Sequence, residues 1–363
     1  MIRKSGEMPK TNRAHRRGLS AAAIGVLSAL TAACGGSAAS TGSATTAGGA
    51  GATTSATTAG GSSTAGGSST AANVTVSVGV LPIADVAPLY LGIKQGFFAK
   101  EHLTVSPHSL QGGAAVASAV IGGSLQFGFG ATANLVAAKS HNLPVEFVAN
   151  GDQAAASTST AWSGILVGAK SGITSIKQLA GKTVAANATQ GENELALDAI
   201  LQRNGVSPSS VHVVALPFPT MPAALASGQV AAVTEVEPFV SAIEAKGGVL
   251  LSPLFSGEQP SEMVAGYFTT AKEISSDPSV VNRFVTAMNE SLSYAATNPS
   301  AVRAIIPTYT KISSTVAAKM NLPVWSATIN TASIQSQERL MQQLGWISSA
   351  PPISSLIWAG AKH

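Results

Sequence analysis

The chain has 363 residues and a formal net charge of +4, with six of its 21 Lys and Arg residues and only one acidic residue in the first 33 positions. The remaining chain therefore carries a net charge close to −1. This balance excludes a basic surface for nucleic acid, so we expect no nucleic-acid partner. A single cysteine, Cys34, also excludes an internal disulfide and a cysteine-based metal site.

The N-terminal segment has the pattern of an export signal. A basic start is followed by an apolar stretch at 19–33, which is too short to span a bilayer. The stretch ends LTAACGG, which resembles the bacterial lipobox, although Thr31 stands where Leu is usual. We expect removal of residues 1–33 and lipidation of Cys34, which would anchor the protein to the outer face of the cytoplasmic membrane. An incidental thiol is the alternative.

Residues 34–72 consist almost entirely of Gly, Ala, Ser and Thr. Such a composition buries little apolar surface, so the sequence predicts a disordered tether. A tail without a role is the alternative interpretation. The body that follows, residues 73–363, is long enough for two lobes with sizeable cores.

Strand and helix patterns alternate along the first part of the body. We expect strands at 74–80, 103–109, 126–130 and 145–149, and helices at 88–100, 114–121 and 132–141. This alternation predicts βαβ units and a largely parallel sheet.

The pattern then restarts. We expect strands at 164–169, 183–186, 211–216, 230–234 and 264–270, a capped turn at 175–179, and helices at 191–204, 221–227 and 238–246, before a mainly helical remainder. Lobe one should comprise 73–162 plus 266–363, and lobe two 163–265. Two connections between the lobes would allow hinge closure around a ligand.

Five segments resemble the nitrate, sulfonate, taurine and pyrimidine-precursor binding proteins of ABC importers. They are APLYLGIKQGFF at 87–98, GGSLQFG at 122–128, SIKQLAGKTV at 175–184, AALASGQV at 223–230 and VEPF at 236–239. The resemblance implies a two-lobed α/β periplasmic-binding-protein fold of type II, in which each lobe is a mainly parallel sheet flanked by helices. It also implies a monomeric receptor that passes a small polar solute to an ABC permease. Val236 stands where many relatives have Trp, so the resemblance does not identify the solute.

Four strand-to-helix junctions are candidate ligand contacts. Ligands of open α/β sheets bind beyond the carboxyl ends of strands, where helix N-termini offer free N–H groups to an anion. The junction residues are Leu81 and Ala84, then Gly112, Gly113 and Ala114, then Thr132 and Asn134, and finally Asn187, Thr189 and Gln190. Ordinary turns and helix caps are the alternative at each junction.

Glu235 and Glu237 follow the strand expected at 230–234. A carboxylate at such a strand end could accept hydrogen bonds from an amine or a ring nitrogen, and Glu235 is the better candidate. Glu237 has a strong alternative role as the cap of the helix that begins at Pro238. Tyr90 and Trp162 could form aromatic walls of the site or belong to the core.

The sequence carries little that indicates catalysis. None of the six histidines has metal-ligand spacing, and neither a Gly-x-Ser-x-Gly elbow nor a phosphate loop is present. We therefore expect no cofactor, no bound metal and no enzymatic activity. A ligand-sensing or surface interaction lipoprotein without transport, and an enzyme on the same fold, are the alternatives to an importer receptor.

Overall fold

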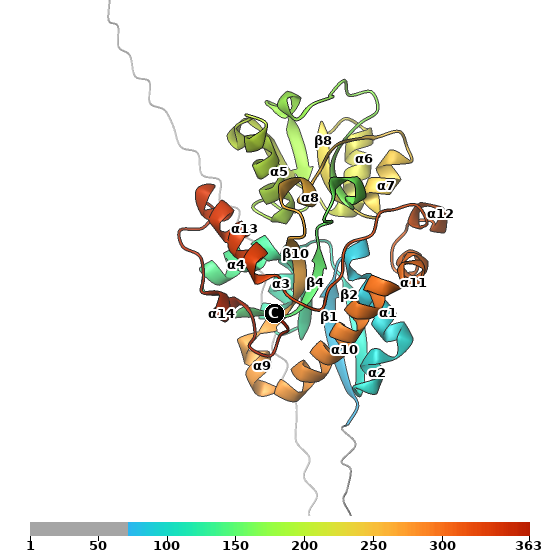
Figure 1. Cartoon of the computed structure of the whole chain (residues 1–363), viewed down its shortest axis with the longest axis vertical. Coiled ribbons are helices and arrows are strands. Elements are labelled where there is room, and N and C mark those ends of the chain that lie inside the picture. Colours follow the sequence, from blue (N-terminus) through green and yellow to red (C-terminus); the bar gives the residue numbers. More distant parts are fainter. Residues whose placement is uncertain (1–71) are drawn as a thin grey trace, which may run out of the picture. The chain divides into compact units, whose positions relative to one another are not determined.

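The computed structural model describes residues 72–363, which form two five-stranded sheets with helices around them (Figure 1). The predicted signal, the lipidation site Cys34 and nearly all of the tether lie outside these residues. Within the described range, no helix combines the length and apolar character needed to cross a membrane.

The first sheet belongs to the lobe that contains both the start and the end of the body. Its strands are β1 (Val74–Val80), β2 (Leu103–Ser109), β3 (Phe127–Ala131), β4 (Val145–Gln153) and β10 (Met263–Thr270), in the order β2-β1-β3-β10-β4. The helices of this lobe are α1 (Ala87–Gln95), α2 (Phe97–Lys100), α3 (Gly113–Ile121), α4 (Thr132–Ser140), α9 (Ala271–Ser276), α10 (Pro278–Thr297), α11 (Pro299–Ile305), α12 (Ser314–Ala317), α13 (Thr331–Gln343) and α14 (Ile353–Leu356).

The second sheet is built from the middle of the chain, drawn green to yellow in Figure 1. Its strands are β5 (Ser163–Val167), β6 (Thr183–Ala186), β7 (His212–Ala215), β8 (Ala232–Val236) and β9 (Val249–Pro253), in the order β7-β6-β8-β5-β9. The helices of this lobe are α5 (Glu192–Arg203), α6 (Met221–Ala226), α7 (Phe239–Glu244) and α8 (Phe255–Glu258). Short 3-10 turns complete the fold: η1 (Ala84–Val86), η2 (Thr158–Thr160), η3 (Ile176–Leu179), η4 (Pro208–Ser210), η5 (Phe218–Thr220) and η6 (Ile306–Thr308).

One strand in each sheet runs against the other strands, and it is the strand by which the chain enters that lobe. β10 pairs antiparallel with β3 and β4, and β5 pairs antiparallel with β8 and β9. The chain leaves the first sheet at the carboxyl end of β4 and enters the second as β5. Because an entering strand runs away from the other lobe, the carboxyl ends of the remaining strands point toward the space between the lobes. The predicted two-lobed α/β fold is confirmed.

Several element boundaries differ from the sequence-based expectations. The helix expected over 88–100 is divided at Gly96, whose φ of 78° lies in the left-handed region that glycine adopts without strain. β9 and α8 were not expected from the sequence. β8 begins later and extends further than expected, so Glu235 lies inside the strand, opposite Gly164 of β5.

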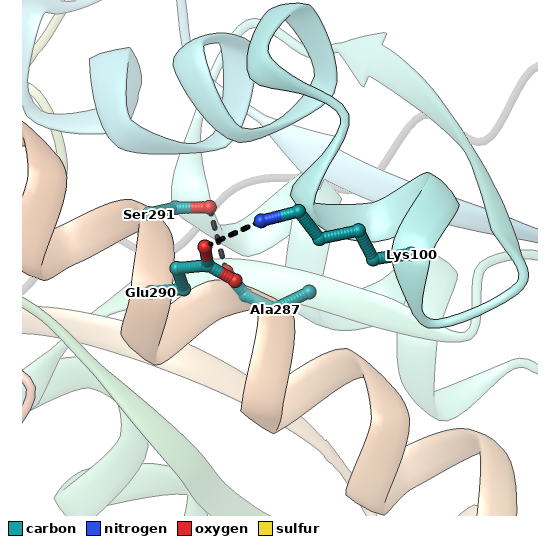
Figure 2. Close-up of polar contacts among 4 residues, drawn as sticks. All are labelled: Lys100, Ala287, Glu290 and Ser291. Atoms are coloured by element: carbon teal, nitrogen blue, oxygen red, sulfur yellow. Dashed lines mark hydrogen bonds and ion pairs between the residues drawn. The ribbon is translucent and has the colours of Figure 1, made fainter.

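The N-terminal helices pack closely on α10. A Cβ atom added to Gly92 of α1 would lie 2.0 Å from Ser291 Oγ, so the two helices need glycine at this contact. Figure 2 shows the Ser291 hydroxyl donating to the Ala287 carbonyl, beside an ion pair of 2.9 Å between Lys100 and Glu290. Both charged side chains are largely exposed, so we expect the ion pair to contribute little to stability.

Candidate functional site

A small cavity lies where the carboxyl ends of the two sets of strands meet. Its lining includes Leu81, Ile83, Asp85, Gly113, Phe129, Ala131 and Asn134 from the first lobe, and Asn187, Ala188, Glu192, Asn193, Phe218, Val236 and Phe255 from the second. The cavity encloses about 30 Å³, which is space for one or two water molecules. Hollows of about 420 and 600 Å³ lie elsewhere, each on the outside of a single lobe.

Two hydrogen bonds join the lobes beside this cavity. Ala84 N–H donates to the carbonyl oxygen of Glu237 at 2.9 Å. Ala133 N–H donates to Glu192 Oε2 at 2.7 Å. The cleft is therefore closed in this conformation, and a solute larger than a few atoms enters only if the lobes separate or side chains move.

The N-terminus of α4, one of the predicted ligand junctions, is occupied by a side chain of the other lobe. The Glu192 carboxylate that accepts the Ala133 N–H is stabilised there because the first N–H groups of a helix lack intrahelical partners and carry partial positive charge. At the neighbouring α5 junction, Gln190 N–H donates to Glu194. The chain's own carboxylates thus take the positions at which an anionic solute was expected.

The α3 junction remains open to a ligand. Gly112 accepts hydrogen bonds from Ala115 and Val116, whereas the N–H groups of Gly113 and Ala114 have no acceptor within residues 72–363. Gly113 also lines the cavity. This is the junction at which backbone N–H groups could still meet a polar or anionic part of a solute.

Asp85 places a buried carboxyl group at the cavity. Its side chain and that of Asp152 on β4 are within hydrogen-bonding distance, which requires a proton on one of them. Burial raises the pKa of Asp85 to about 7, against the hydrogen bond from Asp152. Burial, followed by the charge of Asp85, raises the pKa of Asp152 well above its ordinary value. The pair therefore shares a proton at neutral pH.

A second set of buried carboxyl groups begins at Glu192. Burial raises the pKa of Glu192 well above its ordinary value, although the Ala133 N–H opposes this change. Burial also raises the pKa of Glu258 to about 7, against the positive charge of Arg203. The Arg203 guanidinium donates to the carbonyl oxygens of Gly257 and Glu258, on the side of α8. The cluster is acidic, and the positive charge that acts on it, that of Arg203, is hydrogen-bonded to backbone carbonyl oxygens.

Four of the predicted ligand residues line the cavity: Leu81, Gly113, Asn134 and Asn187. The remaining ones lie outside its lining: Ala84, Tyr90, Gly112, Ala114, Thr132, Trp162, Thr189, Gln190, Glu235 and Glu237. Ala84 and Gln190 take part in the backbone hydrogen bonds described above. Each of the four predicted junctions therefore contributes one of these residues to the lining.

The two glutamates after the expected strand have different roles. Glu237 accepts hydrogen bonds from Ser241 N–H and, at 2.7 Å, from the Ser241 hydroxyl, which confirms the interpretation of Glu237 as a cap of α7. Val236 faces the cavity, and successive strand residues face opposite sides, so Glu235 faces away from it. Glu235 is fully buried in this position. Its contact with a solute stays a prediction that this conformation does not display.

Three further predicted residues serve packing in this conformation. The Thr132 hydroxyl donates to the Met263 carbonyl at 2.9 Å. Trp162 is 1% exposed, donates from Nε1 to Gln153, and lies against Phe255 of the cavity wall. Tyr90 is also removed from the cavity, because its ring stacks on Tyr309 at 4.0 Å between centroids.

The sequence did not lead us to the acidic and aromatic residues that line the cavity. Asp85 directly follows a junction that was singled out, and its charge at a strand end was the available signal. Glu192 is the first residue of α5, a position at which an acidic residue is ordinarily explained by the helix dipole. Phe129, Phe218 and Phe255 carry no local signal of a site, because apolar residues of this kind usually belong to a core.

The acidic groups are not arranged as a metal site. Among residues 72–363, no set of three or more His, Cys, Asp or Glu side chains has a geometry that could hold a metal ion.

The comparisons with known proteins agree with this geometry. The family model described as "NMT1/THI5 like" matches residues 83–302, more than half of the chain. No curated protein sequence matches the chain.

Solved structures share the fold at low sequence identity. The ligand-binding component of an ABC-type import system from Staphylococcus aureus, with zinc bound, has a TM-score of 0.69 and 15% identity, and the match covers 78% of this chain and 96% of that one. The alkanesulfonate-binding protein of Xanthomonas axonopodis pv. citri, bound to MOPS, has a TM-score of 0.65 and 16% identity, with 79% and 99% coverage. The nitrate-binding protein of Synechocystis PCC 6803 has a TM-score of 0.63 and 14% identity, with 76% and 82% coverage.

Proposed function

Because the chain belongs to the NMT1/THI5-like family, we propose that it is the solute receptor of an ABC importer and not an enzyme. The observation that carries the proposal is the cavity between the carboxyl ends of the two sheets, lined by both lobes. A ligand at such a place holds the lobes together, and the closed state can then be recognised by a permease. The receptor acts as a monomer that captures a small polar solute.

The structural neighbours support the same role. They include the ligand-binding component of an import system, an alkanesulfonate-binding protein and a nitrate-binding protein. Their different ligands are consistent with one fold serving several solutes, so the solute of this chain must be argued from its own residues.

We further propose that lobe one comprises 73–162 plus 266–363 and lobe two 163–265, with the hinge in the two connections. The segment between β4 and β5 and the segment before β10 are the two crossings. A third segment lies beside them, since Val324 pairs with Gln153 and Asn321 donates to Ala161. Opening about this hinge would break the bonds of Ala84 and Ala133 to the second lobe.

Protein purified without unfolding should retain a small solute, detectable by native mass spectrometry. Removing that solute by unfolding and refolding should increase the radius of gyration measured by small-angle X-ray scattering, because the lobes then separate. Adding the solute back should reverse the increase. A protein that retains no small molecule and has the same scattering curve before and after refolding would contradict the receptor role.

We propose that the receptor is exported and anchored by lipid at Cys34, with 1–33 removed and 34–72 as a tether. Cys34→Ala should release the protein from the membrane fraction or leave the precursor uncleaved, because the thiol that would carry the lipid is lost. Fractionation and the mass of the purified protein would measure this. Ser40→Ala, in the same tract, is the matched control and should leave membrane association unchanged. Equal membrane retention of both variants would contradict the anchor.

A further inference from the structure

Three buried oxygen atoms at the cavity lack an N–H or hydroxyl donor. Asp85 Oδ2, Asn187 Oδ1 and Glu192 Oε1 are all shielded from solvent, and no N–H or hydroxyl group among residues 72–363 donates to them, so Asp85 has only the proton shared with Asp152 beside it. All three residues line the cavity, Asp85 from the first lobe and the other two from the second. An unpaired buried acceptor is costly, and an unpaired buried carboxylate more so, which indicates that a donor belongs between them.

The described part of the chain supplies no cation to this place. The cavity lining contains no Lys, Arg or His. Arg203, whose positive charge acts on Glu258, is bonded to carbonyl oxygens of α8. The titratable groups that interact with Asp85 are Asp152 on β4, Tyr267 on β10 and Tyr309 after η6, and none of them is positively charged.

An anion fits poorly between the same residues. A sulfonate or nitrate beside Asp85 and Glu192 could bind only while both carboxyl groups stay protonated, because an ionised carboxylate repels an anion strongly where water is excluded. Of the helix N-termini at the cavity that would favour an anion, that of α4 is already occupied by Glu192, which leaves that of α3. The acidic groups of the cavity and its unpaired acceptor atoms therefore both favour a ligand that is positively charged and donates hydrogen bonds.

We propose that the solute is a small organic cation with several N–H groups, such as an alkylammonium, amidinium or guanidinium compound. Its nitrogen donors bridge Asp85 in lobe one to Glu192 and Asn187 in lobe two. Phe129, Phe218 and Phe255 of the cavity wall cover its apolar part, and aromatic faces also attract cations. The proposal rests on the receptor function above and names the class of solute for that site.

A cation that bridges the two carboxyl groups requires both lobes for its binding. Each carboxyl group lies on a different lobe, so a compact dication or a planar guanidinium satisfies both only when the lobes are close together. The present cavity has space for one or two water molecules, so the bound state is slightly more open than this one or has rearranged side chains. An additional polar or anionic group on the solute would lie toward the free N–H groups of Gly113 and Ala114. The cationic nitrogen is the feature that the buried acceptors require.

Isothermal titration of the refolded, solute-free protein tests the class of solute. The probes are putrescine, agmatine, ethanesulfonate and nitrate, and we expect affinity only for the first two. Asp85→Asn and Glu192→Gln should each weaken binding of the amine by about 10- to 100-fold, the loss expected for a hydrogen bond to a charged group. Asp198→Asn, which removes a carboxyl group further along α5 and outside the cavity lining, is the matched control and should bind as the parent does.

The class of solute and the receptor role can fail separately. Ethanesulfonate or nitrate binding without the amines, or a retained solute that is an anion after release, would overturn the cationic class and leave the receptor role intact. The same holds if Asp198→Asn weakens binding as much as Glu192→Gln, because general charge would then explain the effect. If no probe binds and no solute is retained during native purification, both proposals are wrong. A retained cation that competes with putrescine supports both.

Discussion

Raising the pH from about 5 to about 8 should destabilise the solute-free protein by about 3 kcal/mol or more. Burial is the main reason that the pKa values of Asp85, Glu237 and Glu258 rise to about 7 in the folded state. In the unfolded chain such groups ionise near pH 4. The folded state therefore binds more protons between these values, so the stabilisation is complete below about pH 4 and is lost as the pH passes 7.

Thermal unfolding of the refolded protein at several pH values would measure this loss. Asp85→Asn removes one of the titrating groups, so its melting temperature should fall less between pH 5 and pH 8 than that of the parent. Glu290→Gln changes an exposed carboxyl group on α10 and should leave the pH dependence unchanged. A melting temperature that is constant, or that rises across this range, would contradict the presence of protonated carboxyl groups in the interior.

Asp85 and Glu192, whose pKa values burial raises, line the cavity and connect stability to binding. A cationic solute favours their ionised form, so its binding releases protons and strengthens as the pH rises. An anionic solute would show the opposite sign. At neutral pH, ionisation of the carboxyl groups at the cavity lowers the stability of the solute-free protein. A cation in the cavity would raise the stability again.

Phe284→Ala should lower the free energy of unfolding by about 3–5 kcal/mol, the range for truncating a large buried aromatic side chain. Phe284 lies on α10, is fully buried, and stacks on Phe127 of β3 with ring centroids 3.9 Å apart. It also contacts Phe98 of α2 and Tyr267 of β10. Alanine would leave a cavity among elements from four parts of the chain that cannot all collapse into it.

Urea denaturation of the parent and the variant would give the difference. Ile93→Ala, on the adjacent helix α1, is the control because Ile93 is 37% exposed, and its truncation should change stability far less. A loss below about 1.5 kcal/mol for Phe284→Ala would show that the helical layer does not depend on this aromatic cluster.

Local pattern predicted the fold well, because alternation of strands and helices is encoded by side-chain periodicity over short windows. Most expected strands agree with the structure to within a few residues, including β1, β2 and β6, whose expected bounds are those observed. β9 was missed because it is short and lies at a sheet edge, where pairing with β5 rather than local sequence makes it a strand.

Some residues of the predicted junctions line the cavity, whereas its acidic character was not predicted. The junctions after the strands do surround the cavity, and Leu81, Gly113, Asn134 and Asn187 line it. Glu235 was expected at the strand end, but the strand continues to Val236, and a shift of one residue turns a side chain to the other face of a sheet. Register thus decided which residue faces the cavity.

The sequence by itself determined the two-lobed α/β architecture, the edge at which a ligand site should lie, and the family. These follow from periodicity, from strand direction and from motifs that are contiguous in the chain. Only the tertiary structure showed that Asp85 and Glu192, 107 residues apart in the sequence, line one cavity with unpaired oxygen atoms. The physical reason is that burial and the pairing of charges depend on every element packed around a group, and no local pattern contains that information.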